Sequence, residues 1–271
     1  MKPPAFDYVR ADSAEAAAEL LERFGEGARI LAGGQSLMAI LNMRLAQPSL
    51  LIDISRSTSL GAIEHGPKVV RVGAAVTQAQ LQAHPHVPPL LKLAFPHISH
   101  VQIRNRGTVC GSVAHADPSA ELPLCLLALK GTVHLRSARA RRDVAAAEFF
   151  TGLLSTARKN NELIEAISFP RPQAGQGFGF AEHSRRHGDF ALCAVAVVVD
   201  AKELRVAVGG LGDRPHAAVL PPLEGQSLDQ ALNELAWSLD VRDDPHTPAS
   251  TRRHLLRRLA LQAIQQARRP A

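Results

Sequence analysis

A short glycine turn near the N-terminus limits most strongly what this chain can fold into. Gly33 and Gly34 follow an apolar run at residues 28–31 and precede residues 37–45, where apolar side chains recur at helical spacing. This order predicts a strand, a glycine turn and a helix. Glycine permits a positive φ and a close approach to a ligand, and consecutive N–H groups before a helix form a concave anion site. The segment suits a pyrophosphate, although an isolated glycine pair is more often a structural turn.

A second segment, residues 103–123, places small residues among hydrogen-bonding groups. Small residues bring the backbone close to a flat ligand, and hydroxyl and amide groups can then bind phosphate or ribose oxygens. Glu121 can accept from ribose hydroxyls, as an acidic residue does at other dinucleotide sites. The structural alternative is a tight loop in which Asp117 and Pro118 begin a turn and Asp117 caps a helix over about residues 120–130. The two interpretations are compatible.

Familiar phosphate-binding motifs are missing from the sequence. No G-x-G-x-x-G follows a predicted strand, and no G-x-x-x-x-G-K-[ST] occurs. The sequence therefore gives no support to a Rossmann nicotinamide site or to an ATP-hydrolysing P-loop.

Three blocks, taken together, resemble the FAD-binding medium subunit of the molybdenum hydroxylases, the family of xanthine dehydrogenase and carbon monoxide dehydrogenase. They are residues 32–36 with the strand-like run 50–54, residues 104–112, and residues 185–191, in the family's order and at its spacing. The resemblance implies an α+β fold. A two-subdomain FAD-binding domain of the p-cresol methylhydroxylase type would span residues 1–172, divided at about 55. After a linker at residues 170–177, a smaller domain over 176–271 would combine a three-stranded antiparallel sheet with helices.

The resemblance also implies a set of FAD-binding residues. Glu121 matches an acidic position at the ribose, Ile164 an apolar contact, and Phe190 a position near the flavin ring, where an aromatic face could stack or gate access. Phe190 is equally well interpreted as an ordinary core residue at a strand end. Cys110 stands where the family often has glycine, so we expect it at negative φ. The full set is Ala32, Gly33, Gly34, Gln35, Ser36, Leu37, Thr108, Val109, Cys110, Gly111, Ser112, Ala114, Asp117, Glu121, Ile164 and Phe190.

The implied function is that of an oxidoreductase subunit that carries electrons through bound FAD. The electrons would come from iron–sulfur clusters of a small subunit, a large subunit would hold the molybdopterin, and the assembly would be a dimer of heterotrimers. No residue of this chain is expected to be catalytic. The alternative is a stand-alone FAD-dependent oxidoreductase of the same FAD-domain superfamily.

Composition agrees with a globular protein, because 46% of the residues are hydrophobic. No run of 18 apolar residues and no secretory signal are present, so we expect no membrane span and no signal-directed export of this chain by itself; export of an assembled complex by the signal of a partner stays an alternative. The three cysteines lack C-x-x-C spacing, which indicates reduced thiols in the cytoplasm and no iron–sulfur cluster in this chain. His97, His100 and His115 fit no zinc motif, and we expect no metal site.

The C-terminal region is rich in arginine and supplies much of the net charge of +6. A basic amphipathic helix can bind nucleic acid or an acidic surface, so a non-catalytic nucleic-acid-binding protein is a third interpretation. No nucleic-acid motif supports it, and we expect no nucleic-acid partner.

Periodicity and turn residues predict the individual elements. A capping box at Asp12 and Glu15 would begin a helix over residues 13–24. The other expected helices are 77–83, 89–94, 120–130, 228–239 and 249–267. The expected strands are 28–31, 50–54, 69–74, 132–136 and 163–169, with 178–183, 191–200 and 203–208 in the C-terminal sheet.

Overall fold

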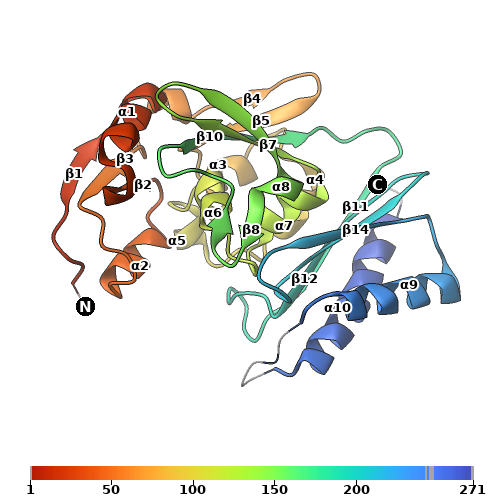
Figure 1. The fold of residues 1–271 in the computed structure, drawn as a ribbon. Helices are drawn as coiled ribbons and strands as arrows, with labels where there is room; N and C mark the ends of the chain where they lie inside the picture. Colours follow the sequence, from red (N-terminus) through yellow and green to blue (C-terminus); the bar gives the residue numbers. More distant parts are fainter. Residues whose placement is uncertain (1, 242, 244–246, 270–271) are drawn as a thin grey trace.

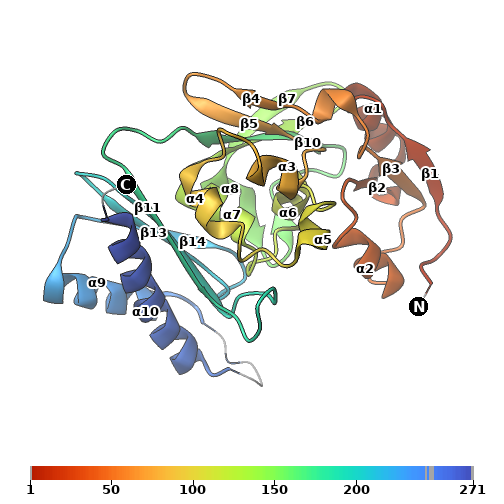
Figure 2. The same cartoon turned by 180° about the vertical axis from the view of Figure 1, so that it is seen from behind.

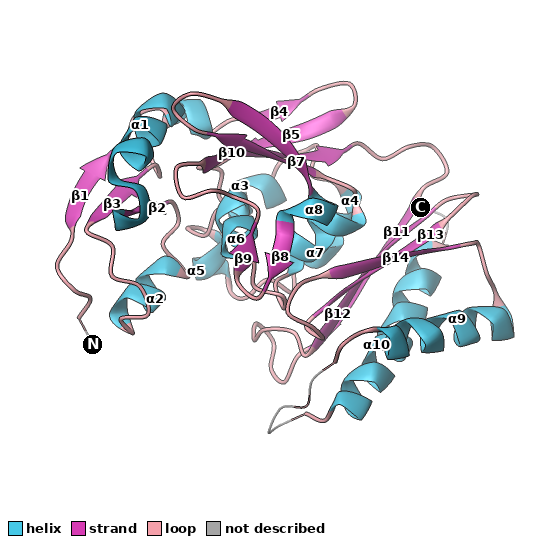
Figure 3. Ribbon diagram, viewed as in Figure 1, coloured by secondary structure: helices cyan, strands magenta, loops and turns pink. Residues whose placement is uncertain are grey.

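The structure is a computed structural model that describes residues 2–241, 243 and 247–269. The strands of these residues form sheets of three, five, four and two strands, with helices between and around them. Figures 1 and 3 show the three-stranded sheet at one end and the four-stranded sheet with its two long helices at the other. The expected α+β class is confirmed. None of the helices formed by the described residues is long and apolar enough to span a bilayer.

The first sheet is parallel and has β3 (Leu50–Asp53) at its centre, between β1 (Asp7–Arg10) and β2 (Ala28–Leu31). Helix α1 (Ala14–Phe24) connects β1 to β2. The buried face of this helix carries mostly small apolar side chains, namely Ala14, Ala17, Ala18 and Leu21. The side chain of Ser13, rather than the predicted Asp12, caps this helix, because its hydroxyl accepts from the Ala16 N–H at 3.1 Å. The segments η1 (Gly25–Gly27), α2 (Leu37–Asn42) and η2 (Thr58–Leu60) complete the region.

The second sheet is antiparallel, in the order β4-β5-β10-β6-β7. Its strands are β4 (Ile63–His65), β5 (Val69–Gly73), β6 (Thr132–Arg136), β7 (Arg141–Ala145) and β10 (Leu163–Pro170). Helices accompany it: α3 (Gln78–Gln82), α4 (Pro89–Ala94), α5 (Val101–Arg104), α6 (Val109–His115), α7 (Glu121–Ala128) and α8 (Ala146–Phe149). The hairpin of β8 (Phe150–Gly152) and β9 (Ser155–Thr156) follows α8.

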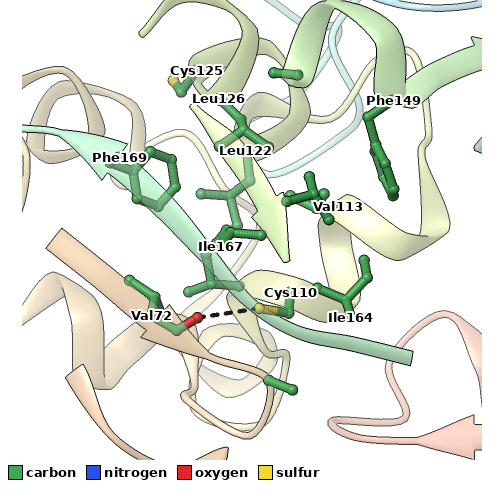
Figure 4. Packing of buried hydrophobic residues seen from close by; sticks show 14 of the residues in the cluster. Val72, Cys110, Val113, Leu122, Cys125, Leu126, Phe149, Ile164, Ile167 and Phe169 are labelled. Atoms are coloured by element: carbon green, nitrogen blue, oxygen red, sulfur yellow. Dashed lines mark hydrogen bonds between the residues drawn. The ribbon is translucent and has the colours of Figure 1, made fainter. Parts of the chain in front are cut away.

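The main core lies between this sheet and helices α6 and α7. All eight residues of α7 are buried, so the helix is covered on every side. Figure 4 shows Ile164 and Ile167 of β10 beside Val113 of α6 and Leu122 of α7. The apolar runs of β10 and α7 therefore specify the centre of the molecule.

The third sheet is an antiparallel meander that covers the other side of α7. It consists of β11 (Gly177–His183), β12 (Cys193–Val199), β13 (Leu204–Gly209) and β14 (His216–Leu220). The three predicted strands are present, and β14 adds a fourth at the edge. Helices α9 (Gly225–Ser238) and α10 (Ala249–Ala267) lie on the face of the sheet that is turned away from α7 (Figure 2). Gly177 and Gly179 permit this contact, since a Cβ there would lie 1.8 and 1.9 Å from carbonyl oxygens of α10.

Candidate functional site

The two glycine-bearing segments meet backbone to backbone. A Cβ built on Gly33 would lie 2.1 Å from the carbonyl oxygen of Arg106 and 2.7 Å from Cα of Gly107. A Cβ on Gly107 would in turn lie 3.5 Å from Cγ of Gln35. Only glycine at position 33 allows this approach. The loop after β2 and the loop after α5 are therefore in direct contact.

The first loop keeps several backbone donors unused. Gly34 adopts a φ of +73°, which glycine allows without steric cost. Within the described part of the chain, the N–H groups of residues 33–36 donate to no protein acceptor. Gln35 turns its side chain inward, and its Nε2 donates to the carbonyl of Gly33 at 3.0 Å. The loop thus presents four consecutive donors just before α2, the arrangement that binds anions in backbone nests.

The second loop is held by Thr108 and by backbone bonds to the turn before α3. The hydroxyl of Thr108 accepts from the N–H of Gly111 at 2.9 Å and so caps α6. Cys110 adopts the expected negative φ. Its Sγ points into the core, 3.5 Å from the carbonyl oxygen of Val72, and burial raises the pKa of this thiol to about 12 (Figure 4). Val109 and Cys110 are fully covered, so they can offer a ligand only backbone groups.

Gln78 also belongs to this junction, although the sequence did not point to it. Its N–H donates to the carbonyl of Gly107 at 2.8 Å, and its side chain is buried. Its Oε1 has no hydrogen-bond partner among the described residues. A buried polar atom without a partner is costly, which makes it a mark of a missing ligand or water. The neighbouring Thr77 and Gln80 form a capping box at the start of α3. From the sequence, this segment is therefore interpreted only as a helix.

Asp117 does not cap α7 as predicted. Its Oδ1 accepts from the N–H of Ser119 at 2.8 Å, and Ala120 occupies the N-cap position without a side-chain bond. The turn that follows α6 also joins the C-terminal sheet, because the carbonyl of Pro118 accepts from the N–H of Gly210 at 2.8 Å. Asp117 therefore shapes the loop between α6 and α7 and leaves the helix N-terminus uncapped.

Two of the remaining predicted residues lie in very different surroundings. Ile164 is buried beside Cys110 in the core (Figure 4). Phe190 is 64% exposed, so its interpretation as a core residue is wrong. Phe190 lies in the loop between β11 and β12. The same loop contacts the segment before α5, since a Cβ on Gly188 would lie 2.8 Å from the ring of His100. The third sequence block thus contacts the segment that leads into the second block.

Among the predicted site residues with a carboxyl group, Glu121 has the pKa that departs most from its ordinary value. It is only 7% exposed at the start of α7, and this burial raises the pKa of its carboxyl to about 7. Glu182 of β11 lies nearby, and burial followed by the charge of Glu121 raises its pKa to about 8. In the part of the chain that the structure describes, no three His, Cys, Asp or Glu side chains are arranged to hold a metal ion.

The geometry agrees with what comparison with known proteins finds. Residues 4–172 match the family model described as the FAD binding domain in molybdopterin dehydrogenase. The chain belongs to this family. The resemblance seen in the sequence is therefore confirmed, and the chain carries the FAD-binding domain of a molybdopterin dehydrogenase.

Relatives of this family match the chain over almost its whole length. The medium subunit of nicotine 6-hydroxylase from Paenarthrobacter nicotinovorans is 38% identical over 283 residues, covering 98% of this chain and 99% of that protein. Subunit alpha of the 6-hydroxypseudooxynicotine dehydrogenase complex of the same organism is 36% identical and covers 98% and 96%. A chain of carbon monoxide dehydrogenase from Hydrogenophaga pseudoflava superposes with a TM-score of 0.93 at 30% identity, covering 98% of both chains. These relatives are subunits of oxidoreductases.

Proposed function

We propose that this chain is the FAD-carrying electron-transfer subunit of a molybdenum-dependent hydroxylase or dehydrogenase complex. It would receive electrons from iron–sulfur clusters of a small subunit and deliver them to an external acceptor. The observation that carries the proposal is the direct contact between the loops at residues 32–37 and 104–112, in a chain of this family. Flavin suits this position because it accepts and releases electrons singly or in pairs.

The residues present fit a dinucleotide. The unused N–H groups of residues 33–36, with the hydroxyl of Ser36, would hold the pyrophosphate. Across the contact, Thr108, Gly111 and Ser112 would continue the site, and the unpartnered Oε1 of Gln78 is an acceptor for a hydroxyl group. Glu121 would accept from the ribose, and Phe190, being exposed, is free to lie against the flavin ring.

The other predicted contacts would be made mainly by the backbone or by packing. Cys110 and Ile164 support the site from the core. The first loop begins with Ala32 and ends with Leu37, Val109 lies in the second loop, and Ala114 and Asp117 follow it.

The proposed domain boundaries follow the sheets. We infer that residues 1–172 form the FAD-binding domain, with subdomains meeting at about residue 55, and that residues 176–271 form a separate C-terminal domain. The first two sheets fall within the first range and the meander within the second, which supports this division. The extreme ends of these ranges, residues 1 and 270–271, lie outside the described residues.

The proposed partners are an iron–sulfur small subunit and a molybdopterin large subunit, in a dimer of heterotrimers. The names of two relatives, a medium subunit and a subunit of a dehydrogenase complex, support a multi-subunit assembly. The three free, buried thiols support the cytoplasmic location expected from the sequence.

A pair of glycine variants tests the site. Gly34→Ala introduces a side chain at a φ of +73°, and Gly175→Ala does the same at +80° with no atom within 4 Å. Both therefore carry a similar backbone penalty of about 1–2 kcal/mol, but only the first changes the proposed pyrophosphate loop. We expect Gly34→Ala to purify with less FAD and Gly175→Ala to retain it. Equal FAD content in the two variants would contradict the site.

Purification of the complex tests the function itself. The proposal predicts a yellow chain that co-purifies with two partners and oxidises no substrate alone. Turnover by the isolated yellow chain would instead support the stand-alone oxidoreductase. A colourless chain that retains nucleic acid in a salt-dependent manner would support the third interpretation.

A further inference from the structure

Strand β10 is irregular next to one of the predicted FAD contacts. Its register against β6 pairs Ile164 with Leu135 and Ala166 with His134, so Glu165 is inserted between two consecutive pairs. An insertion of this kind is a β-bulge, and β-bulges are common beside functional sites because they re-aim neighbouring side chains. The bulge therefore decides which face of the sheet each residue at the start of β10 occupies.

The bulge reverses the faces that two residues would otherwise occupy. Successive side chains of a regular strand point to opposite faces. Since Ile167 and Phe169 belong to the main core, regular alternation would also place residue 165 in the core and residue 164 outside it. The structure shows the opposite, because Ile164 is buried in the core, whereas the carboxyl group of Glu165 pairs with charged groups outside it. The inserted residue thus turns Ile164 inward, beside Cys110 of the second loop (Figure 4).

Three arginines hold the carboxyl group of Glu165. Nη1 of Arg136 lies 2.8 Å from Oε1, Nη2 of Arg141 lies 3.3 Å from the same oxygen, and Nη2 of Arg71 lies 3.8 Å from Oε2. Only 15% of the Glu165 side chain is exposed, so solvent screens these pairs less than on an open surface. Nη2 of Arg136 also lies 2.6 Å from Oε1 of Glu15, which extends the cluster to α1. The carboxyl group therefore anchors the bulge to β5, β6 and β7.

The backbone at the bulge is also linked to the second loop. The carbonyl of Glu165 accepts from the N–H of Ala74 at 3.1 Å. Ala74 begins the turn that leads to α3, and in this turn the carbonyl of Val76 accepts from the N–H of Val109 at 3.1 Å. The bulge therefore supports the second loop in two ways, through the side chain of Ile164 and through these backbone hydrogen bonds.

We propose that Glu165 is a positioning residue for FAD: its ion pairs hold the bulge, and the bulge keeps Ile164 and the second loop in the geometry that binds the cofactor. Without the charge of Glu165, the three guanidinium groups would repel one another, and the inserted residue would lose the contacts that keep it outside the core. This inference rests on the proposed function for the role of FAD, whereas the placement of Ile164 belongs to the chain alone.

The variant Glu165→Gln removes the charge and keeps the shape of the side chain. In the full-length chain, ¹³C labels on the δ1-methyl groups of isoleucine report on the surroundings of Ile164, and Ile164→Val identifies its NMR signal. We expect this signal to shift in FAD-free Glu165→Gln. We also expect the dissociation constant for FAD to rise by at least about tenfold, the lower end of the loss seen when residues that orient metal ligands are removed.

Two variants with the same substitution serve as controls. The carboxyl group of Glu162 pairs with Arg142 at 2.7 and 2.8 Å and holds the loop before β10 instead of the bulge. Glu162→Gln should therefore lower the melting temperature of the chain without weakening FAD binding. Glu64→Gln removes the other acid that pairs with Arg71, at 3.6 Å, and should leave the Ile164 signal unchanged.

The outcomes are distinguishable. An unchanged Ile164 signal in Glu165→Gln would show that the ion pairs do not place Ile164. A shifted signal with FAD affinity no lower than that of Glu162→Gln would overturn the positioning role. If the wild type binds no FAD, the positioning role fails together with the proposed function, and the Ile164 signal still decides whether the ion pairs hold the bulge.

A milder variant covers the case in which Glu165→Gln does not fold. Arg141→Gln removes one of the three ion pairs, and the Arg141 side chain is 63% exposed, so the chain should fold. The Ile164 signal should shift and FAD should bind more weakly than in Glu162→Gln. If neither change occurs in Arg141→Gln, the inference is wrong.

Discussion

Replacing Gly33 by alanine tests whether the contact between the two loops creates the FAD site. The new Cβ would begin 2.1 Å from the Arg106 carbonyl, and Cβ contacts essentially never fall below 3.0 Å. The loops must therefore move apart by about 0.9 Å, since the obstructing atoms belong to the backbone. Overpacking of this kind costs about 1–3 kcal/mol. Since the same backbone groups would bind the pyrophosphate, we expect FAD affinity to fall by at least about tenfold, or about 1.4 kcal/mol.

The assay is thermal unfolding with and without FAD. At a free FAD concentration about 100 times the wild-type dissociation constant, FAD should stabilise the wild type by about 2.7 kcal/mol. A tenfold weaker variant would gain only about 1.4 kcal/mol under the same conditions. Gly61→Ala is the control, because its Cβ would meet ordinary contacts at 3.5 and 3.7 Å and its φ is negative. If Gly33→Ala gains as much from FAD as Gly61→Ala does, the two loops do not form a joint site.

Two further predictions concern single side chains. Phe190→Ala should leave the free energy of unfolding within about 0.5 kcal/mol of the wild type because the ring is exposed, yet it should alter the visible absorption of bound FAD. Phe180→Ala, which removes a buried ring, should by comparison cost about 3–5 kcal/mol. An unchanged flavin spectrum in Phe190→Ala would remove Phe190 from the site. Burial opposes ionisation of Glu162, but bonds from Arg142 and from the N–H of Lys159 outweigh it and lower its pKa below 4.5. Its ionised form therefore contributes stability that is lost as the pH falls below about 4.5, and acid titration of Glu162→Gln, followed by circular dichroism, should show a shallower loss than in the wild type.

The sequence predicted the central elements of the fold because their residues carry clear signals. The apolar run of β10 and the fully buried α7 are recognisable from composition alone. The strands that were missed in the three large sheets, β1, β4, β7 and β14, all lie at sheet edges. Edge strands are often short and polar, as Arg141–Ala145 illustrates with its exposed and charged residues. Their pairing depends on neighbours that the local sequence does not reveal.

The candidate site divides in the same way. The contact of Gly33 with the second loop could be anticipated because the two glycine segments occur together in the order and at the spacing of one family. Ser13 and Asp12 are both good capping residues, and only the backbone geometry at Ser13 decides between them. Gln78 could not be found, since its importance comes from burial next to a segment distant in the sequence.

A crystal structure of the chain with FAD bound tests the account most directly. We predict pyrophosphate oxygens within about 3 Å of the N–H groups of residues 33–36, and the same FAD molecule in contact with residues 108–112. FAD bound elsewhere, or held by only one of these loops, would contradict the claim that the two segments jointly form its site.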